Sequence, residues 1–277
     1  MIALFIAIVF TAGIFWVFKW HGNNGDNLNI TVVTNYFVAA IIGFLVNRQH
    51  LYELNDNFTN NIWPLLALGL LFITTFVLIG YSTKKSGIGL TVMASKLSIF
   101  VTIFLSFLIF KDSIGIKTIL ALPIAIASII LYQFTKGEKK RKKDLWLPLV
   151  VLLGSGIVDF FLAWISKNSD WTTGLNASII FLIAATLGVI QVLFTQFRIK
   201  RIDILIGVVL GSINYASIHF YLLAFKQTTN NPLYFLLFSI VTLLISSIGS
   251  IALFKEPINR NKIIALSLSC LALYLAY

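Results

Sequence analysis

The stretch that decides the fold is FKDSIGIKTILALPIAIASIILYQ, residues 110–133, because a related stretch returns later in the chain. The second copy is FKEPINRNKIIALSLSCLALYLAY, residues 254–277, at a constant offset of 144 residues and without a gap. Seven of the 24 aligned positions are identical, and Asp112 aligns with Glu256. Each copy has an apolar end, a Lys-acid pair, a short polar turn and an apolar segment. The chain is therefore predicted to consist of two related halves.

The composition indicates a membrane protein. The 277 residues are 58% hydrophobic and only 11% charged, with a mean hydropathy of +0.93. Soluble domains carry about 25% charged residues. A water-soluble domain of this length could not bury so much apolar surface, and the apolar segments are long enough to cross a bilayer at roughly 20 residues each. We therefore expect a polytopic, all-α integral membrane protein.

Ten membrane-spanning helices are expected, each bounded by polar residues. In the first half they cover residues 1–18, 30–46, 62–82, 89–109 and 115–134. In the second half they cover residues 145–166, 174–195, 202–225, 231–254 and 261–277. Because five is an odd number, the second half must enter the membrane from the opposite side, so the two repeats are inverted. Inverted repeats that meet at a site near the midplane of the bilayer are a recurrent plan among transporters.

The two halves are expected to form one membrane domain. Residues 1–135 form the first five-helix repeat and residues 145–277 the second, and the basic segment KGEKKRKKD at 136–144 links them. This linker and the other odd-numbered connections hold most of the basic residues. The positive-inside rule therefore places the odd connections in the cytoplasm and both termini outside it. The expected location is the inner (plasma) membrane of a bacterium.

The net charge of +11 could suggest a protein that binds nucleic acid. The charge lies in the connections of a membrane protein, however, where it sets the topology and contacts anionic lipid head groups. We therefore expect a lipid bilayer, and no nucleic acid, as its partner. The single cysteine, Cys270, lies in an apolar span and excludes an intrachain disulfide.

Signatures of catalysis and of cofactor binding are missing from the sequence. It contains no GxxxxGK[ST], HExxH or GxSxG motif and no cysteine–histidine spacing typical of a metal site. The three histidines, His21, His50 and His219, are far apart, and the first two fall in predicted loops. We expect no enzyme activity, no cofactor and no metal.

The sharper signal is charge inside the predicted spans. Lys96 in the fourth span and Asp159 in the sixth are the only Lys, Arg, Asp or Glu residues well inside a span. Each costs about 2.5–3.5 kcal/mol at the centre of a helix, so a functional reason is expected. One interpretation is a solvated cavity in which Lys96 binds an anionic group and Asp159 binds a cationic group or a proton. The alternative is a buried ion pair that only holds the two halves together.

Other polar residues within the spans are candidates for the wall of the same cavity. His219 in the eighth span could relay protons, or could simply hydrogen-bond to a neighbouring helix. Asn35 and Tyr36 in the second span, with Asn214 and Tyr215 in the eighth, supply further hydrogen-bonding groups that must face protein or water. For the asparagines, contact between helices is as good an interpretation as contact with a substrate.

With these features the chain resembles the EamA-like branch of the drug/metabolite transporter superfamily. The resemblance covers essentially the whole chain and rests on ten spans, two five-helix halves, and the stretch SKLS around Lys96. The turns Lys111-Asp112 and Lys255-Glu256 stand where the family often has Gly-Glu or Asn-Glu. The resemblance implies a basket with a cavity lined mainly by the first, third, fourth, sixth, eighth and ninth spans. Three of these spans carry the two intramembrane charges and the histidine described above.

The resemblance also implies transport of amino acids, nucleosides, sugars, other metabolites or drugs, often outward. The first hypothesis is therefore a secondary transporter, acting as an exporter, of a small polar metabolite, with protons as a candidate coupling ion. A second hypothesis is a non-transporting membrane subunit of a complex. A third is a flippase for a lipid-linked metabolite, whose cavity would open sideways to lipid. The sequence leaves the substrate and the oligomeric state open.

Overall fold

The structure, a computed structural model, describes residues 2–55, 58–110, 116–133, 146–193, 199–226 and 231–276. Within these ranges the chain forms eleven α-helices and a short 3₁₀ helix, with no strand. The elements are α1 (Ile2–Asn24), α2 (Leu28–Val46), η1 (Arg48–Asn55), α3 (Phe58–Ser86), α4 (Ile88–Leu97), α5 (Ile99–Phe110), α6 (Ile116–Gln133), α7 (Trp146–Asn168), α8 (Thr173–Leu193), α9 (Arg201–Lys226), α10 (Asn231–Phe254) and α11 (Arg260–Ala276). The predicted linker at 136–144 and the Lys111-Asp112 turn lie outside the described residues.

The helices have the length and surface of membrane-spanning segments. In the part of the chain that the structure describes, six helices or helix pairs are long and apolar enough to cross a bilayer, and three further apolar helices are shorter. Large apolar side chains such as Leu45, Ile248 and Leu253 are exposed on the outside of the bundle. Such a surface is costly in water and favourable in lipid. The prediction of an all-α membrane protein with several spans is confirmed.

The fourth predicted span, 89–109, is divided in two. It forms α4 and α5, which are separated at Ser98. The Ser98 hydroxyl donates to the backbone carbonyl of Ser95 at 2.6 Å, and the N–H of Val101 donates to the carbonyl of Ser98 at 2.9 Å. The Ser98 carbonyl also accepts from the N–H of Thr102 at 3.1 Å, and Ser98 keeps helical backbone angles, so the interruption is one residue long and α4 and α5 form one span of 22 residues.

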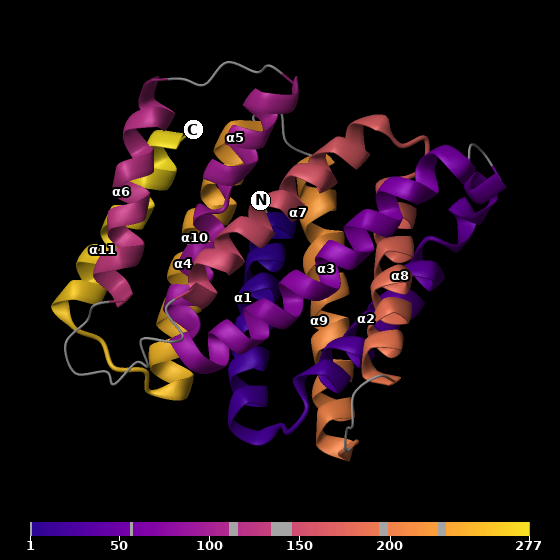
Figure 1. Ribbon diagram of the computed structural model, residues 1–277, viewed down its shortest axis with the longest axis horizontal. Coiled ribbons are helices and arrows are strands. Elements are labelled where there is room, and N and C mark those ends of the chain that lie inside the picture. Colours follow the sequence, from indigo (N-terminus) through magenta and orange to yellow (C-terminus); the bar gives the residue numbers. More distant parts are fainter. Residues whose placement is uncertain are drawn as a thin grey trace.

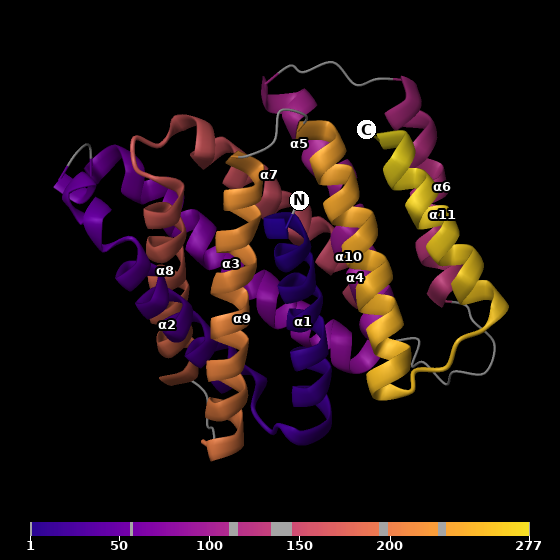
Figure 2. The same ribbon diagram turned by 180° about the vertical axis from the view of Figure 1, so that it is seen from behind.

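The helices are arranged between two outer pairs. Figures 1 and 2 show α6 and α11 side by side at one side of the bundle and α2 and α8 at the opposite side, with the remaining helices between them. The contacts follow a repeated pattern. Helix α1 packs on α9 and α10, while α7 packs on α3 and on α4 and α5; α2 packs on α9, while α8 packs on α3. These contacts of α1 and α2 thus have counterparts five predicted spans away, whereas the packing of α1 on α3 has no comparable counterpart among the described residues.

Small residues allow the closest approaches between helices. A Cβ atom added at Gly211 of α9 would lie 2.5 Å from the backbone oxygen of Asn35 on α2. One added at Gly207 would lie 2.8 Å from the backbone oxygen of Thr31. Only glycine fits at these two positions without a shift of the backbone. Close packing of this kind replaces the hydrophobic effect, which gives helices little attraction for one another inside lipid.

Candidate functional site

The two intramembrane charges come together in the middle of the bundle. Lys96 lies near the C-terminal end of α4, and Asp159 lies in the interior of α7, against which α4 packs. Both groups are deep within the protein and close enough for their charges to interact. Among the described residues, however, no ion pair joins the Lys96 ammonium to the Asp159 carboxylate.

Each charge has a different partner. The Nζ atom of Lys96 lies over the ring of Phe238 on α10, 4.4 Å from the ring centroid. The Oδ2 atom of Asp159 accepts a hydrogen bond of 3.2 Å from the hydroxyl of Ser98, the residue at which α4 and α5 separate. A cation–π contact and one hydroxyl bond leave much of the hydrogen-bonding capacity of both charged groups unused.

The environment of these groups is deep but accessible. Surrounding helices enclose both side chains, yet Asp159 is an exposed residue and Lys96 is only half-buried. Because Asp159 is exposed, a small polar molecule can reach its carboxylate.

Helix α7 is fixed closely against the break between α4 and α5. A Cβ atom added at Gly156 would lie 2.5 Å from Cβ of Val101 and 2.7 Å from the backbone oxygen of Ser98. The hydroxyl of Thr102 donates to the carbonyl of Gly156 at 3.1 Å. Gly156 lies one turn before Asp159, so this contact sets the position of the carboxylate relative to the Ser98 hydroxyl.

Two of the predicted site residues on α9, Tyr215 and His219, lie one turn apart on the same face of that helix. The rings of Tyr215 and His219 stack, with centroids 5.7 Å apart and an interplanar angle of 27°. The side-chain amide of Asn47 donates to the Tyr215 hydroxyl at 3.4 Å, and His219 also contacts the ring of Phe220 at 5.5 Å. His219 is half-buried, and no described contact joins it to Asp159.

The remaining predicted site residues hold helices together. The side-chain amide of Asn214 donates to the side-chain oxygen of Asn35 at 3.1 Å, and both residues are buried. The fully buried Tyr36 donates its hydroxyl hydrogen to the backbone carbonyl of Phe72 on α3 at 2.9 Å. The structure therefore brings Asn35 and Asn214 together as an interhelical pair, separately from Lys96 and Asp159.

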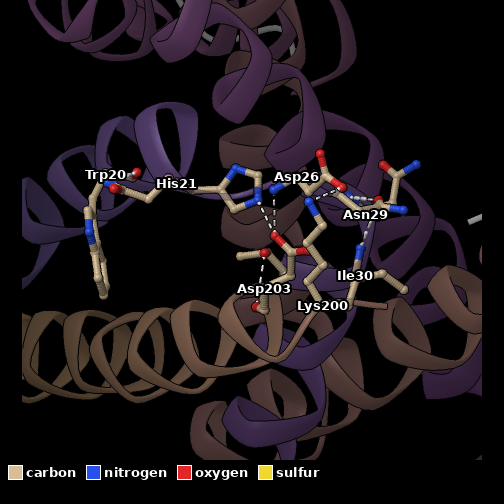
Figure 3. A network of polar contacts seen from close by, with 10 residues as sticks. Trp20, His21, Asp26, Asn29, Ile30, Lys200 and Asp203 are labelled. Carbon is tan, nitrogen blue, oxygen red and sulfur yellow. Dashed lines mark hydrogen bonds and ion pairs between the residues drawn. The ribbon is translucent and has the colours of Figure 1, made fainter. Parts of the chain in front are cut away.

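A polar network at one end of the bundle was not predicted from the sequence. His21, which the sequence analysis assigned to a loop, is buried in the last turn of α1, and its Nε2 atom lies 3.1 Å from Oδ1 of Asp203 on α9. The same oxygen accepts from the backbone N–H of Asp26 at 2.9 Å, and Lys200 pairs with Asp26 at 2.9 Å (Figure 3). The signal in the sequence is an acidic residue in the first turn of a span, where it complements the helix dipole.

Two further residues of the site, Phe238 and Ser98, were not predicted from the sequence. Phe238 is one of 24 phenylalanines and Ser98 one of many serines, so neither type of residue marks a site by itself. The described residues contain no group of three or more His, Cys, Asp or Glu side chains that could hold a metal ion.

Comparisons with known proteins give information about the fold but not about the function. No family description matches the chain. A protein of Haemophilus influenzae, described as uncharacterized, is 27% identical over 216 residues, which cover 76% of this chain and 74% of the relative. The crystal structure of a protein that is 12% identical superimposes with a TM-score of 0.68 and covers 99% of this chain and 95% of its own. This second likeness shows that the same fold occurs in an experimentally solved protein.

Proposed function

We propose that the protein is a secondary transporter that moves a small polar metabolite across a bacterial inner membrane. The observation that carries the proposal is the arrangement of Lys96 and Asp159, which face each other between the halves without an ion pair. The substrate class is a compound with an anionic and a cationic or hydrogen-bonding group, such as an amino acid or a nucleoside. Lys96 binds the anionic group, and Asp159 binds the cationic group or a coupling proton.

The energetics of intramembrane charge support this role. A buried pair that serves only stability is expected to combine its charges directly and to saturate their hydrogen bonds, because the desolvation of each ion is otherwise uncompensated. Here the ammonium lies on an aromatic ring and the carboxylate accepts one hydroxyl bond. The remaining capacity is available to a ligand. Intramembrane ionisable residues that face a cavity commonly mark a transport pathway.

The symmetry of the helix contacts supports alternating access. The packing of α1 on α9 and α10 recurs as the packing of α7 on α3 and on α4 and α5. The packing of α2 on α9 recurs as that of α8 on α3, and α6 packs on α11. Such a pattern is expected of two inverted five-helix repeats in which α4 and α5 together make one interrupted span. In this proposal one half moves against the other around Lys96 and Asp159.

Direction and orientation follow from the same proposal. The resemblance to the EamA-like branch favours export. The positive-inside rule puts the end of the bundle that holds Lys19, Lys84, Lys85, Lys200 and Arg260 in the cytoplasm.

A ligand screen tests the function. Purified protein would be screened by thermal shift against amino acids, nucleosides, sugars and organic acids, because a ligand of the folded state raises the apparent melting temperature. Lys96→Ala should abolish the shift, while Lys117→Ala, which removes an exposed lysine at the start of α6, should preserve it. A positive ligand should then show flux in liposomes that contain this protein alone. Flux that requires a second protein, or a ligand shift that survives Lys96→Ala, would contradict the proposal.

A further inference from the structure

We propose that Glu256 is a gate residue, and that its contacts close the pathway at the end of the bundle where α1 ends and α4 begins. This inference rests on the proposed transport function and concerns how access to the same site is controlled. Glu256 lies in the connection between α10 and α11, far in the sequence from both charged site residues. Its side chain is mostly buried between helices of the two halves.

A single carboxylate oxygen of Glu256 joins two helices of the other half. Oε1 forms an ion pair of 2.8 Å with Nζ of Lys19, in the second-last turn of α1. The same oxygen accepts a hydrogen bond of 3.2 Å from the backbone N–H of Ile88, the first residue of α4. Both contacts join the second half of the chain to the first. Any motion that separates the halves at this end must therefore break them.

Helix α4 depends on this contact for its N-terminal cap. The residue before the helix is Gly87, with φ +90°, and it makes no side-chain capping bond. The first backbone N–H groups of a helix need an acceptor, and a carboxylate there also complements the helix dipole. Glu256 supplies both from outside the helix. A Cβ atom at position 87 would lie 3.2 Å from the Glu256 carboxylate, so the glycine also makes room for it.

The turn that carries Glu256 is held in a strained shape. Lys255 has φ 52°, in the left-handed region that is unfavourable for a residue other than glycine. The N–H of Glu256 donates to the carbonyl of Ser250 at 3.2 Å, and the buried ammonium of Lys262 donates to the carbonyl of Pro257 at 2.6 Å. These bonds hold the turn in the shape that directs Glu256 towards α4.

Helix α4 connects Glu256 to the candidate site. Ile88 and Lys96 are eight residues apart on one continuous helix, which corresponds to about 12 Å along its axis. Ser98, which bonds to Asp159, follows two residues after Lys96. Because α4 is one continuous helix from Ile88 to Leu97, a displacement at its start is transmitted to Lys96. Release of Glu256 would move Lys96 and open the site towards this end.

Thiol accessibility in a substrate-free preparation tests the gate. Lys96→Cys in a Cys270→Ala background places one reporter thiol at the site. A membrane-impermeant thiol reagent is then applied to sealed vesicles from the side that carries Glu256. Glu256→Gln should increase the labelling rate roughly tenfold or more, because the ion pair is lost and the cap is weakened. Hydrogen exchange of the amides in residues 87–97 should rise in parallel.

The matched control is Glu53→Gln. Glu53 also joins the two halves, since it accepts a hydrogen bond of 2.6 Å from the backbone N–H of Thr172 before α8, but it lies far from α4 in the chain. Glu53→Gln should change neither the labelling rate of the reporter thiol nor the hydrogen exchange of the amides in residues 87–97. If Glu256→Gln does not fold, Lys19→Met provides the test, because it removes the ion pair and leaves the bond to Ile88. It should raise the labelling rate in the same direction by a smaller factor.

The outcomes separate the gate from the transport function. Faster labelling with Glu256→Gln and not with Glu53→Gln supports the gate, whatever ligand the screen finds. Unchanged labelling in folded Glu256→Gln or Lys19→Met, or an equal rise with Glu53→Gln, overturns it and makes Glu256 a static cap. A failed ligand screen with the expected labelling would count against transport and not against Glu256.

Discussion

The charged residues at the end of the bundle and those in its middle are arranged in opposite ways. At the end, His21 is 3.1 Å from Asp203, Lys200 is 2.9 Å from Asp26, and the groups are further tied by backbone N–H bonds (Figure 3). In the middle, Lys96 and Asp159 lie on helices that pack against each other, and among the described residues no ion pair joins them.

This difference distinguishes polar groups that stabilise the fold from charged groups that are available to bind a ligand. A paired and hydrogen-bonded charge stabilises the position of its helix, and losing one partner leaves the other buried and unpaired. Asp203 also keeps one buried oxygen, Oδ2, without a hydrogen-bond partner, so the feature that distinguishes Asp159 is its exposure. An exposed charge without an ion-pair partner can bind a ligand. Substitutions at the end should therefore reduce stability, and substitutions in the middle should reduce ligand binding.

The largest effect on stability is expected for Asp203→Ala. Asp203 is completely buried and its Oδ1 atom meets both His21 and the N–H of Asp26, so the substitution removes one hydrogen-bond partner from each. Loss of a hydrogen-bond partner from a buried group costs about 1–3 kcal/mol, and two groups lose one here. Denaturation in detergent should show this loss, whereas Asp159→Ala should lower stability far less and abolish the ligand shift. Equal losses of stability for Asp203→Ala and Asp159→Ala would show that the two carboxylates do not differ in their contribution to the fold.

A smaller loss of stability is expected for Gly156→Ala. The added methyl group would contact Cβ of Val101 at 2.5 Å and the backbone oxygen of Ser98 at 2.7 Å, and neither atom can move without shifting its helix. Overpacking of this kind costs about 1–3 kcal/mol. Gly13→Ala is the matched control, because its methyl group would meet only ordinary contacts at 3.5 Å or more. The apparent melting temperature should fall for the first variant and stay the same or rise for the second.

The pair Asn35–Asn214 should couple α2 to α9 by a modest amount. Hydrogen bonds between helices within membranes average about 0.6 kcal/mol in double-mutant cycles and reach about 1.7 kcal/mol. Asn35→Ala, Asn214→Ala and the double variant should give a coupling energy in that range, with the ligand shift intact. A ligand shift that disappears in either single variant would instead assign these amides to the substrate site.

The smallest effect is expected for Glu53→Gln and depends on pH. Partial burial raises the pKa of Glu53, but hydrogen bonds from Thr172 and from the His50 ring, 2.9 Å away, outweigh it and lower the pKa below its ordinary value of 4.5. A lowered pKa in the folded state means that the ionised carboxylate stabilises the fold above pH 4.5 and loses this contribution as the pH falls below it. The difference in melting temperature between native protein and Glu53→Gln should therefore narrow on acidification. A melting-temperature difference that widens on acidification would contradict the lowered pKa of Glu53.

The fold class could be predicted because lipid imposes few choices on a backbone. Long apolar segments must be helical, and their ends are marked by polar residues. The contact between Ser98 and Asp159 could not be predicted in this way, because it joins side chains 61 residues apart on different helices. A contact that depends on the approach of two distant helices leaves no local pattern in the sequence.

The same reasoning explains which parts of the candidate site were foreseen. Lys96 and Asp159 were identified because charge in an apolar span is rare and costly. Asn35 and Asn214 were identified by the same criterion, as polar residues within apolar spans, although in the structure their side-chain amides bind each other. Polarity within a span shows that a group needs a partner, and only the fold shows whether that partner is another helix. Phe238 gave no signal, because an aromatic ring in an apolar helix is ordinary.

The pairing of α6 with α11 has a consequence for biosynthesis. These helices carry the two related stretches and pack against each other at the side of the bundle, with few contacts to the other helices (Figure 1). More than a hundred residues separate them in the chain, so at ribosomal speed α6 enters the bilayer on the order of ten seconds before its partner is made. Its exposed apolar surface meets lipid or the insertion machinery in the meantime. Assembly of this side of the protein therefore belongs to the last step of its synthesis, and a ribosome that stalls before α11 leaves a chain with an unpaired fifth span.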